Sequence, residues 1–285
     1  MDRPVIVGVD GSDCSVEAVR WAAAEAGRRG APLRLVHTWV WPLLGVGLGP
    51  APGAPPDAGL EAQAERILSE GADLARTVSP GLAVETSLVT GDASVRLVDA
   101  SRDAQLLVVG HRGLGGFAGL LLGSVGAAVA AHAECPVAVV RGELDGTGAV
   151  VVGVDASERS QHVLQEAIAA ADRLDAPVRA VHCVELPLRQ HLARSYQDAL
   201  AGATREARER LEKQVAEARS AAGPDVAVDL RLGDLPPAKE LVAASADARL
   251  VVVGSRGAGG LTGMLLGSTG HALIHHSTCP VLIVR

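Results

Sequence analysis

The chain contains the same segment twice, and this internal repeat constrains its fold more than any other feature. Pro4–Ser12 reads PVIVGVDGS, and Ala149–Ser157 reads AVVVGVDAS. The two halves also end alike, in CPVAVVR and CPVLIVR, and the last 32 residues of each half share 18 identities without a gap. A chain of 285 residues suits two domains of ordinary size. We therefore interpret the sequence as a tandem duplication of one domain.

The boundary between the two copies is predicted within residues 142–148, which read GELDGTG. A short polar segment with several glycines is typical of a linker. We expect a first domain over residues 1–141 and a second domain over residues 148–285. Because so short a linker keeps the copies close, they are expected to form an intramolecular pseudo-dimer, the covalent counterpart of a homodimer.

Strand and helix patterns alternate within each copy. In the first copy, Val5–Val9 is an unbroken apolar run, whereas Ser15–Arg28 carries its apolar residues at helical spacing. Further strands are expected at residues 33–40, 83–89, 106–109 and 137–140, and further helices at residues 61–77, 94–101 and 124–131. Unbroken runs of Val, Ile and Leu indicate strands that are buried on both faces, and hence a parallel sheet. The predicted fold class is α/β, with two tandem doubly wound domains of about five strands each and helices on both faces of each sheet.

Composition argues against several classes of partner. The formal net charge is −7 and Lys occurs only at positions 213 and 239, so the chain lacks the basic cluster that nucleic-acid binding needs. No apolar run of about 18 residues is free of Pro and Gly, so no membrane span is expected. The amino terminus does not read as a signal peptide and the cysteines form no C-x-x-C pair, which favours reduced thiols and a cytoplasmic location.

Each copy carries a glycine-rich loop between a strand and a helix, with the spacing G-x2-G-x9-G-S. The motif residues are Gly110, Gly113, Gly123 and Ser124 in the first copy and Gly254, Gly257, Gly267 and Ser268 in the second. Glycine lets the backbone approach a phosphate closely, and free N–H groups at a helix start attract an anion. Each motif serine is expected at the N-cap, where its hydroxyl can either cap the helix or donate to a phosphate. The loops lack the Lys of a Walker A motif, and their position after the fourth strand differs from that of the dinucleotide fingerprint.

Asp10 and Asp155 follow the first strand of each copy. They are expected to meet the glycine loops at the carboxyl edge of the sheet, where doubly wound domains bind ligands. Glycine-rich turns also occur purely for tight packing, but two loops of the same spacing, each with its own aspartate, favour binding. Arg112 and Arg256 lie inside the loops, either near phosphates or in solvent, and both interpretations stay open.

The opening V-G-V-D-x-S, the glycine loops and the closing C-P-V strand together resemble the universal stress proteins in their tandem-domain, ATP-binding form. The resemblance covers nearly the whole chain. It implies the strand order 3-2-1-4-5 in each sheet. It also implies ATP bound with Mg²⁺ or a similar ion, usually one nucleotide per domain, in a stress-response regulator that hydrolyses ATP slowly at most.

The resemblance also implies roles for individual residues. The strand-end positions around the nucleoside are Gly8, Asp10 and Thr38 in the first copy and Gly153, Asp155 and Cys183 in the second. The aspartates would contact the ribose or adenine, and the glycines would let the nucleotide lie close to the first strand. Thr38 and Cys183 stand where the family usually carries a Val that touches adenine. The motif glycines and serines would hold the phosphates. The predicted sites also include Arg112, Gly115, Gly116, Val125, Arg256, Gly259, Gly260 and Thr269.

Two other functions remain open. One is a nucleotidyl-transferring or ATP-hydrolysing enzyme, and the other is a structural pseudo-dimer with vestigial nucleotide sites. Phosphoryl transfer needs a positioned nucleophile and charge-stabilising Lys or Arg, and the sequence shows no such apparatus, so no catalytic residue is assigned. Protein partners and the association of two chains into a homodimer are also open.

Several reactive residues outside the motifs are interpreted without a function. His37 and His182 are interpreted as strand-end histidines whose rings are hydrogen-bonded within the fold. Cys14 follows the first strand near the predicted ligand, but no basic residue lies beside it in sequence. No carboxylate or Cys completes a metal site with the histidines at positions 271, 275 and 276, so a helix face is expected and no metal ligand is assigned. Trp41–Gly59, rich in Pro and Gly, is either a loop that covers the nucleotide or contacts partners, or a disordered segment.

Overall fold

The computed structural model describes residues 3–39, 59–114, 123–144, 146–155, 157, 159–184, 196–257 and 266–285. The chain divides into two compact units, Met1–Arg141 and Gly142–Arg285, and each is described by itself. The predicted loop Trp41–Gly59 lies outside the described residues except for Gly59.

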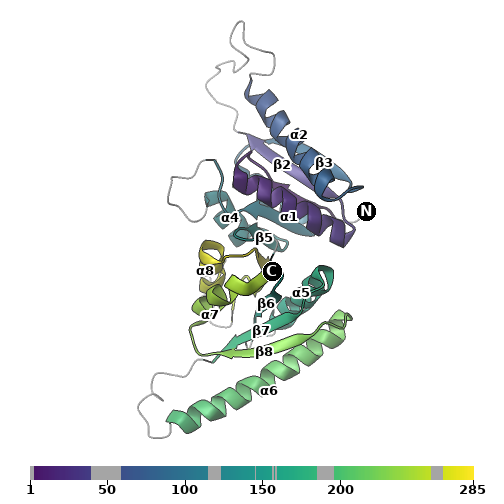
Figure 1. The fold of residues 1–285 in the computed structure, drawn as a ribbon. Helices are drawn as coiled ribbons and strands as arrows, with labels where there is room; N and C mark the ends of the chain where they lie inside the picture. Colours follow the sequence, from purple (N-terminus) through teal and green to yellow (C-terminus); the bar gives the residue numbers. More distant parts are fainter. Residues whose placement is uncertain are drawn as a thin grey trace. The chain divides into compact units, whose positions relative to one another are not determined.

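The first unit is a parallel five-stranded sheet in the order β3-β2-β1-β4-β5. Figure 1 shows its strands β3 and β2 beside the helix α2. Its elements are β1 (Val5–Gly8), α1 (Asp13–Arg29), β2 (Leu33–Trp39), α2 (Leu60–Val78), β3 (Val84–Thr90), α3 (Ala93–Ala100), η1 (Ser101–Asp103), β4 (Leu106–Gly110), α4 (Ser124–His132) and β5 (Val137–Val140). The predicted α/β fold, the parallel sheet and the strand order 3-2-1-4-5 are confirmed.

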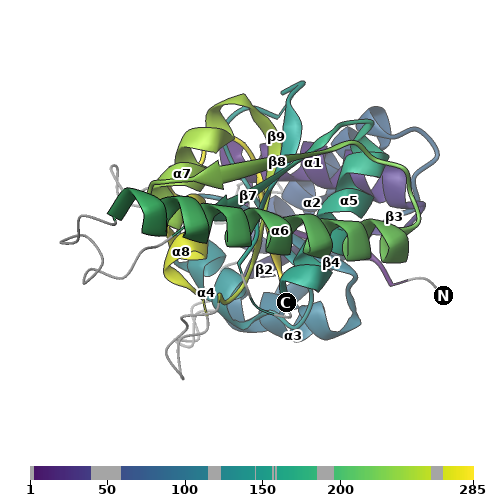
Figure 2. The ribbon, with the colours of Figure 1, turned by 90° about the horizontal axis from the view of Figure 1, so that it is seen from below.

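The second unit repeats this arrangement in the order β8-β7-β6-β9-β10. Its elements are β6 (Ala149–Gly153), α5 (Arg159–Leu174), β7 (Val178–Cys183), α6 (Tyr196–Ala222), β8 (Val228–Gly233), α7 (Pro237–Ala244), η3 (Ser245–Asp247), β9 (Ala248–Gly254), α8 (Ser268–His276) and β10 (Val281–Val284). The long helix α6 packs beside α5 and β8 (Figure 2). None of the described helices is both long and apolar enough to cross a membrane.

The central strands are buried because helices cover both faces of each sheet. In the first unit α1 packs against α2, and α3 packs against α4. Val5, Ile6 and Val7 of β1 are fully buried between these layers. This burial explains why the strands consist of unbroken aliphatic runs. It also leaves the loops at the strand ends as the part of each unit that can present polar groups.

The predicted linker is packed against the second unit. The Glu143 N–H donates to the Thr278 carbonyl at 2.9 Å. A Cβ built on Gly146 would lie 3.3 Å from the Ala248 carbonyl oxygen, and one on Gly148 would overlap the Asp247 carbonyl. Glu143 is therefore bound to the turn before β10, and Gly146 and Gly148 fit closely against the backbone around the start of β9.

The helix that follows each glycine loop begins one residue later than predicted. The N-caps of α4 and α8 are Gly123 and Gly267, and Ser124 and Ser268 are the first helical residues. The predicted N-cap position of the two serines was therefore wrong by one residue. A hydroxyl at the first helical position is past the point from which an N-cap side chain accepts a backbone N–H.

Candidate functional site

Asp10 links the end of β1 to the glycine loop after β4. Its Oδ1 accepts hydrogen bonds from the Ser12 N–H at 3.0 Å and the Ser12 hydroxyl at 2.6 Å. Its Oδ2 accepts from the Leu114 N–H at 2.9 Å. Gly113 lies so close to this carboxylate that a Cβ on it would overlap Oδ2. The structure thus brings together Asp10 and the first glycine loop, as the sequence predicted.

The carboxyl of Asp10 is held in its charged form. Burial raises its pKa, but hydrogen bonds from the Ser12 hydroxyl, the Ser12 and Leu114 amides and the Ser15 hydroxyl together outweigh burial and lower the pKa. A charged carboxylate repels a phosphate and accepts hydrogen bonds from hydroxyl groups. Asp10 is therefore suited to accept hydrogen bonds from hydroxyl donors rather than to bind an anion.

Asp155 occupies the same place in the second unit. Its Oδ1 accepts from the Ser157 N–H at 2.9 Å, from the Ser157 hydroxyl at 2.5 Å and from the Ser160 hydroxyl at 2.7 Å. A Cβ on Gly257 would lie 3.0 Å from its Oδ2. The second aspartate therefore also meets its glycine loop.

Both loops are closed at their base by the same pair of backbone hydrogen bonds. In the first unit the His111 N–H donates to the Val140 carbonyl at 3.0 Å, and the Gly123 N–H donates to the His111 carbonyl at 2.8 Å. In the second unit the Ser255 N–H donates to the Val284 carbonyl at 2.7 Å, and the Gly267 N–H donates to the Ser255 carbonyl at 2.8 Å. The residue after each fourth strand therefore fixes where its loop begins and ends.

The last glycine of each loop is not required by the packing around it. Gly123 and Gly267 have φ values of −77° and −70°, which any residue can adopt. Among the described residues, the nearest heavy atom to a Cβ built on either glycine is 3.6 Å away, an ordinary contact. Within the described part of the chain, no side chain caps α4 or α8, and neither helix has an acid in its first turn. Each helix start therefore combines uncapped N–H groups, a positive dipole end and a backbone without a side chain.

The strand-end glycines, in contrast, have a packing role. A Cβ on Gly8 would lie 2.9 Å from Cδ1 of Leu97, and one on Gly153 would lie 2.7 Å from Cδ1 of Leu241. Both leucines are buried. The space at each glycine is thus filled by a core leucine of α3 or α7, whereas the resemblance implies that this space serves a nucleotide.

The remaining predicted residues are placed as follows. Ser124, Arg112, Arg256 and Ser268 are exposed, and Thr38, Val125, Cys183, Gly110, Gly254 and Thr269 are half-buried. A Cβ on Gly110 would lie 2.7 Å from the carbonyl oxygen of Cys14, so this glycine allows β4 to approach α1. Gly115, Gly116, Gly259 and Gly260 lie outside the described residues.

The histidines of the second strands are structural, as predicted. Nδ1 of His37 lies 2.7 Å from the Val9 carbonyl oxygen, and Nδ1 of His182 lies 2.8 Å from the Val154 carbonyl oxygen. A carbonyl only accepts, so each Nδ1 carries the hydrogen. On α8 the rings of His271 and His275 lie 4.5 Å apart, yet no group of three or more possible ligands for a metal ion occurs among the residues that the structure describes.

His111 is a residue of the first loop that sequence reasoning missed. Its Nε2 lies 3.8 Å from the Sγ of Cys14, although the two residues are 97 positions apart in the chain. The sequence interpretation that Cys14 has no basic neighbour is thus incomplete, because the neighbour comes from the end of β4. Only the sheet order, which places β4 next to β1, could have indicated this pair.

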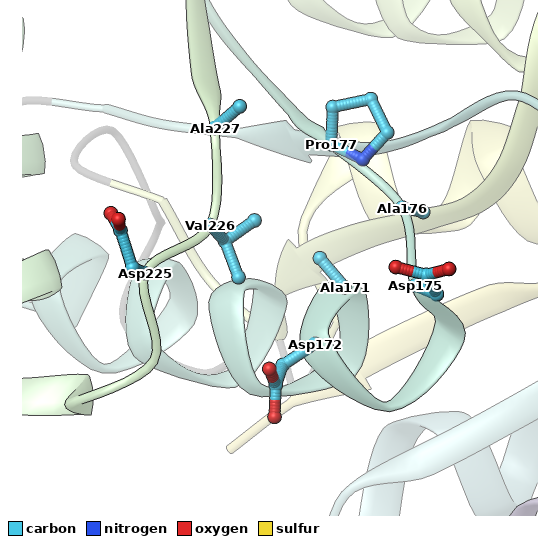
Figure 3. Close-up of a pocket in the computed structure, with 8 residues that line it drawn as sticks. All are labelled: Ala171, Asp172, Asp175, Ala176, Pro177, Asp225, Val226 and Ala227. Atoms are coloured by element: carbon cyan, nitrogen blue, oxygen red, sulfur yellow. The ribbon is translucent and has the colours of Figure 1, made fainter.

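The pocket shown in Figure 3 lies elsewhere in the second unit. It has a volume of about 310 Å³, and its lining includes Asp172, Asp175, Pro177 and Asp225. Pro177 directly precedes β7, so the pocket is at the amino ends of the strands, away from the glycine loop. Three aspartates at its wall disfavour a phosphate. Its lining therefore does not suit a phosphate-bearing ligand.

Fold and geometry together define a class of protein: tandem doubly wound α/β units, each with a glycine loop and an aspartate that meet at the carboxyl edge of its sheet. Comparison with known proteins identifies the family. The model of the universal stress protein family matches residues 1–141 and 147–285. The chain belongs to the universal stress protein family, as two tandem copies of its domain.

Relatives of known name have the same tandem form. A universal stress protein of Mycobacterium tuberculosis is 35% identical over 309 residues, covering 99% of this chain and 96% of the relative. One of Mycolicibacterium smegmatis is 34% identical over 299 residues, with the same coverage of 99% and 96%. The crystal structure of a universal stress protein from Archaeoglobus fulgidus has the same fold, with a TM-score of 0.70 and 22% identity over 99% of this chain and 96% of that chain.

Proposed function

We propose that each unit of this protein binds ATP at its glycine loop and that the protein acts as a nucleotide-dependent stress-response regulator. The observation that carries the proposal is the start of α4 and of α8. At Gly123 and Gly267 neither the backbone conformation nor the packing of the residues that the structure describes requires a glycine. A phosphate that approaches the helix start does require one, because a side chain would block it.

The proposed orientation follows from charge. The triphosphate lies at the amino end of α4, where the helix dipole and the uncapped N–H groups attract an anion. The ribose lies toward Asp10, whose charged carboxylate accepts hydroxyl donors. Asp155 and the start of α8 act in the same way in the second unit.

Mg²⁺ fits this arrangement as a partner of the phosphates. It keeps several waters and is typically bound by one or two protein oxygens together with phosphate oxygens. Both oxygens of Asp10 already accept hydrogen bonds, whereas the exposed Ser124 hydroxyl does not cap its helix. We assign Ser124, and Ser268 in the second unit, as the protein ligands that would hold Mg²⁺ beside the phosphates. The ion would neutralise phosphate charge.

A regulatory rather than an enzymatic role follows from what surrounds the loops. Fast phosphoryl transfer uses a base that orients the nucleophile and cations that stabilise the transition state. Asp10 is committed to three hydrogen bonds, and the ring of His111 faces a thiol and a carbonyl. We therefore expect at most slow hydrolysis, with occupancy of the loops as the signal that protein partners read. All four cysteines are present as thiols, which suits a reducing cytoplasm as the place of action.

Substitution of the last loop glycine tests the proposal. Gly123→Ala should lower the ATP affinity of the first site at least about tenfold, because the methyl group occupies the path of the phosphate while it meets nothing closer than 3.6 Å in the protein. Gly267→Ala should do the same at the second site. The matched control is Gly202→Ala on α6, where an added Cβ meets nothing within 4 Å.

Calorimetric titration with Mg·ATP, together with a thermal melt of each variant, reads out the result. Normal ATP affinity in folded Gly123→Ala and Gly267→Ala chains would remove the loops from the binding site. Loss of binding in Gly202→Ala as well would show that the effect is not local.

A further inference from the structure

A thiol and an imidazole face each other behind the first glycine loop. Cys14 is in the first turn of α1 and His111 directly follows β4, and both are half-buried. The Cys14 Sγ and the His111 Nε2 are 3.8 Å apart. A nucleophilic atom within reach of a base is the arrangement that activates cysteines for reaction.

The hydrogen bonds of His111 determine which of its nitrogens faces the thiol with a lone pair. Nδ1 lies 3.3 Å from the Val140 carbonyl oxygen, which can only accept, so Nδ1 carries the hydrogen. Nε2 is then the nitrogen that can take a proton from Cys14. Burial lowers the pKa of His111, the Val140 hydrogen bond opposes this, and the charges of Arg141 and Arg112 lower the pKa further. The imidazole is therefore neutral and able to accept a proton at ordinary pH.

His111 is also part of the base of the loop. Its carbonyl accepts from the Gly123 N–H at 2.8 Å, and its N–H donates to Val140 at 3.0 Å. On the opposite side Cys14 is pressed against β4, since a Cβ on Gly110 would lie 2.7 Å from the Cys14 carbonyl oxygen and 3.1 Å from its Cβ. An atom added to Sγ enlarges the side chain beside the His111 ring, and the backbone of His111 holds Gly123.

The second unit lacks this pair. Arg159 and Ser255 stand at the positions that correspond to Cys14 and His111. Of the other cysteines, Cys135 and Cys279 are buried and only Cys183 is half-buried. The chain thus offers a built-in comparison, with one loop that has a thiol–imidazole pair and one that has not.

We propose that Cys14 and His111 form a peroxide-reactive thiol site whose oxidation displaces Gly123 at the start of α4 and releases the nucleotide of the first unit, while the second unit keeps its own nucleotide. The gating half of this inference rests on the proposed function, whereas the reactivity of the thiol does not. In the reaction His111 takes the thiol proton and the sulfur attacks one oxygen of hydrogen peroxide. An S–O bond forms, the O–O bond breaks, and the leaving hydroxide receives the proton from His111 to become water. Cys14 is oxidised to a sulfenic acid as the peroxide is reduced.

The first test measures the thiol without nucleotide. The full chain is treated with hydrogen peroxide and dimedone, and peptide mass spectrometry follows the adduct at Cys14 and at Cys183. Cys14 should react faster, and His111→Ser should slow it about tenfold or more, because the base is lost. Serine is the residue that the second loop carries at this position, so the variant should fold. Equal rates at Cys14 in the wild-type and His111→Ser chains would overturn the reactive pair.

The second test measures gating by calorimetric titration with Mg·ATP before and after oxidation. Oxidised wild-type chain should bind one ATP fewer than the untreated chain, thiol reduction should restore it, and Cys14→Ser should bind normally with or without peroxide. A Cys14 sulfenic acid with undiminished ATP stoichiometry would overturn the gating. A wild-type chain that binds no nucleotide before treatment would contradict the proposed function and the gating with it, while the adduct rates still decide the reactive pair.

Discussion

Asp10 joins two stretches of the chain that lie 104 residues apart, and it does so with a charged group. Its oxygens accept from Ser12 on one side and from Leu114 on the other, so the carboxylate positions the entry to the glycine loop as well as its own turn. The sequence predicted this meeting, because Asp10 and Gly110 both lie at the carboxyl ends of parallel strands. It did not predict the hydrogen-bond partners, which depend on the path of the loop.

The lowered pKa of Asp10 makes the stability of the fold depend on pH in a definite direction. A carboxyl with a lower pKa in the folded than in the unfolded chain contributes stability above its unfolded pKa of about 3.9, and this contribution is lost as the pH falls through the folded value. The free energies of unfolding of the wild type and of Asp10→Asn, measured with urea, should therefore converge as the pH falls from about 5 toward 2. Curves that stay parallel over this range would show that the Asp10 charge does not stabilise the fold.

His111 and Cys14 mark the limit of sequence reasoning at this scale. A thiol–imidazole contact across 97 residues has no local signal, because neither residue belongs to the glycine motif. Ser124 shows a different limit. Glycine and serine both favour the N-cap, so a Gly-Ser pair leaves the start of the helix uncertain by one residue.

At the scale of elements, the aliphatic runs and helical spacing predicted each described strand and α-helix of the first unit to within two residues at each end, but not the short 3-10 helix η1. These elements were predictable because a sheet buried on both faces has few polar positions to confuse the pattern. What the pattern could not predict is how α3 fits against β1. Leu97 fills the space above Gly8, so a glycine that the family resemblance assigns to the nucleotide also has a packing role.

A double-mutant cycle tests that packing role. Gly8→Ala should destabilise the fold by about 1–3 kcal/mol through overpacking against Leu97, and Leu97→Ala should cost about 2–5 kcal/mol through the cavity that it leaves. In the double variant the new methyl group enters that cavity. Its loss of unfolding free energy should therefore be smaller than the sum of the two single losses by about 0.5–3 kcal/mol. Denaturant unfolding gives the change in the free energy of unfolding for each of the three variants. Strict additivity would show that Gly8 does not contact Leu97.

For the whole molecule, duplication explains why each feature of the site occurs twice. Asp10 and Asp155, and Gly123 and Gly267, have matching surroundings in the two units. The repeat was visible in sequence because the glycine loops and closing strands are nearly identical. The close fit of Gly146 and Gly148 was not visible in the sequence, because a polar segment with several glycines is typical of a free linker.

The linker segment gives a prediction for the second unit. Gly148→Ala should destabilise the second unit by about 1–3 kcal/mol, because the new Cβ would overlap the Asp247 carbonyl. A backbone carbonyl cannot relieve the overlap by changing rotamer, as a side chain can. Gly202→Ala is again the matched control, and it should be neutral or stabilising by up to about 1 kcal/mol because alanine favours the helix. Thermal melts of the full chain compare the two. If both variants melt like the wild type, residues 142–148 do not pack as described.

The central claim is that both glycine loops hold ATP, and the amount of nucleotide per chain tests it most directly. The purified protein is denatured, its released nucleotide is separated by ion exchange beside standards, and the stripped protein is titrated with Mg·ATP in a calorimeter. We predict ATP or ADP in the supernatant and a titration end point of about two ATP per chain, since each unit presents one complete loop. A protein that releases no nucleotide and shows no heat on titration would contradict the account, and its loops would then be structural elements of a vestigial pseudo-dimer.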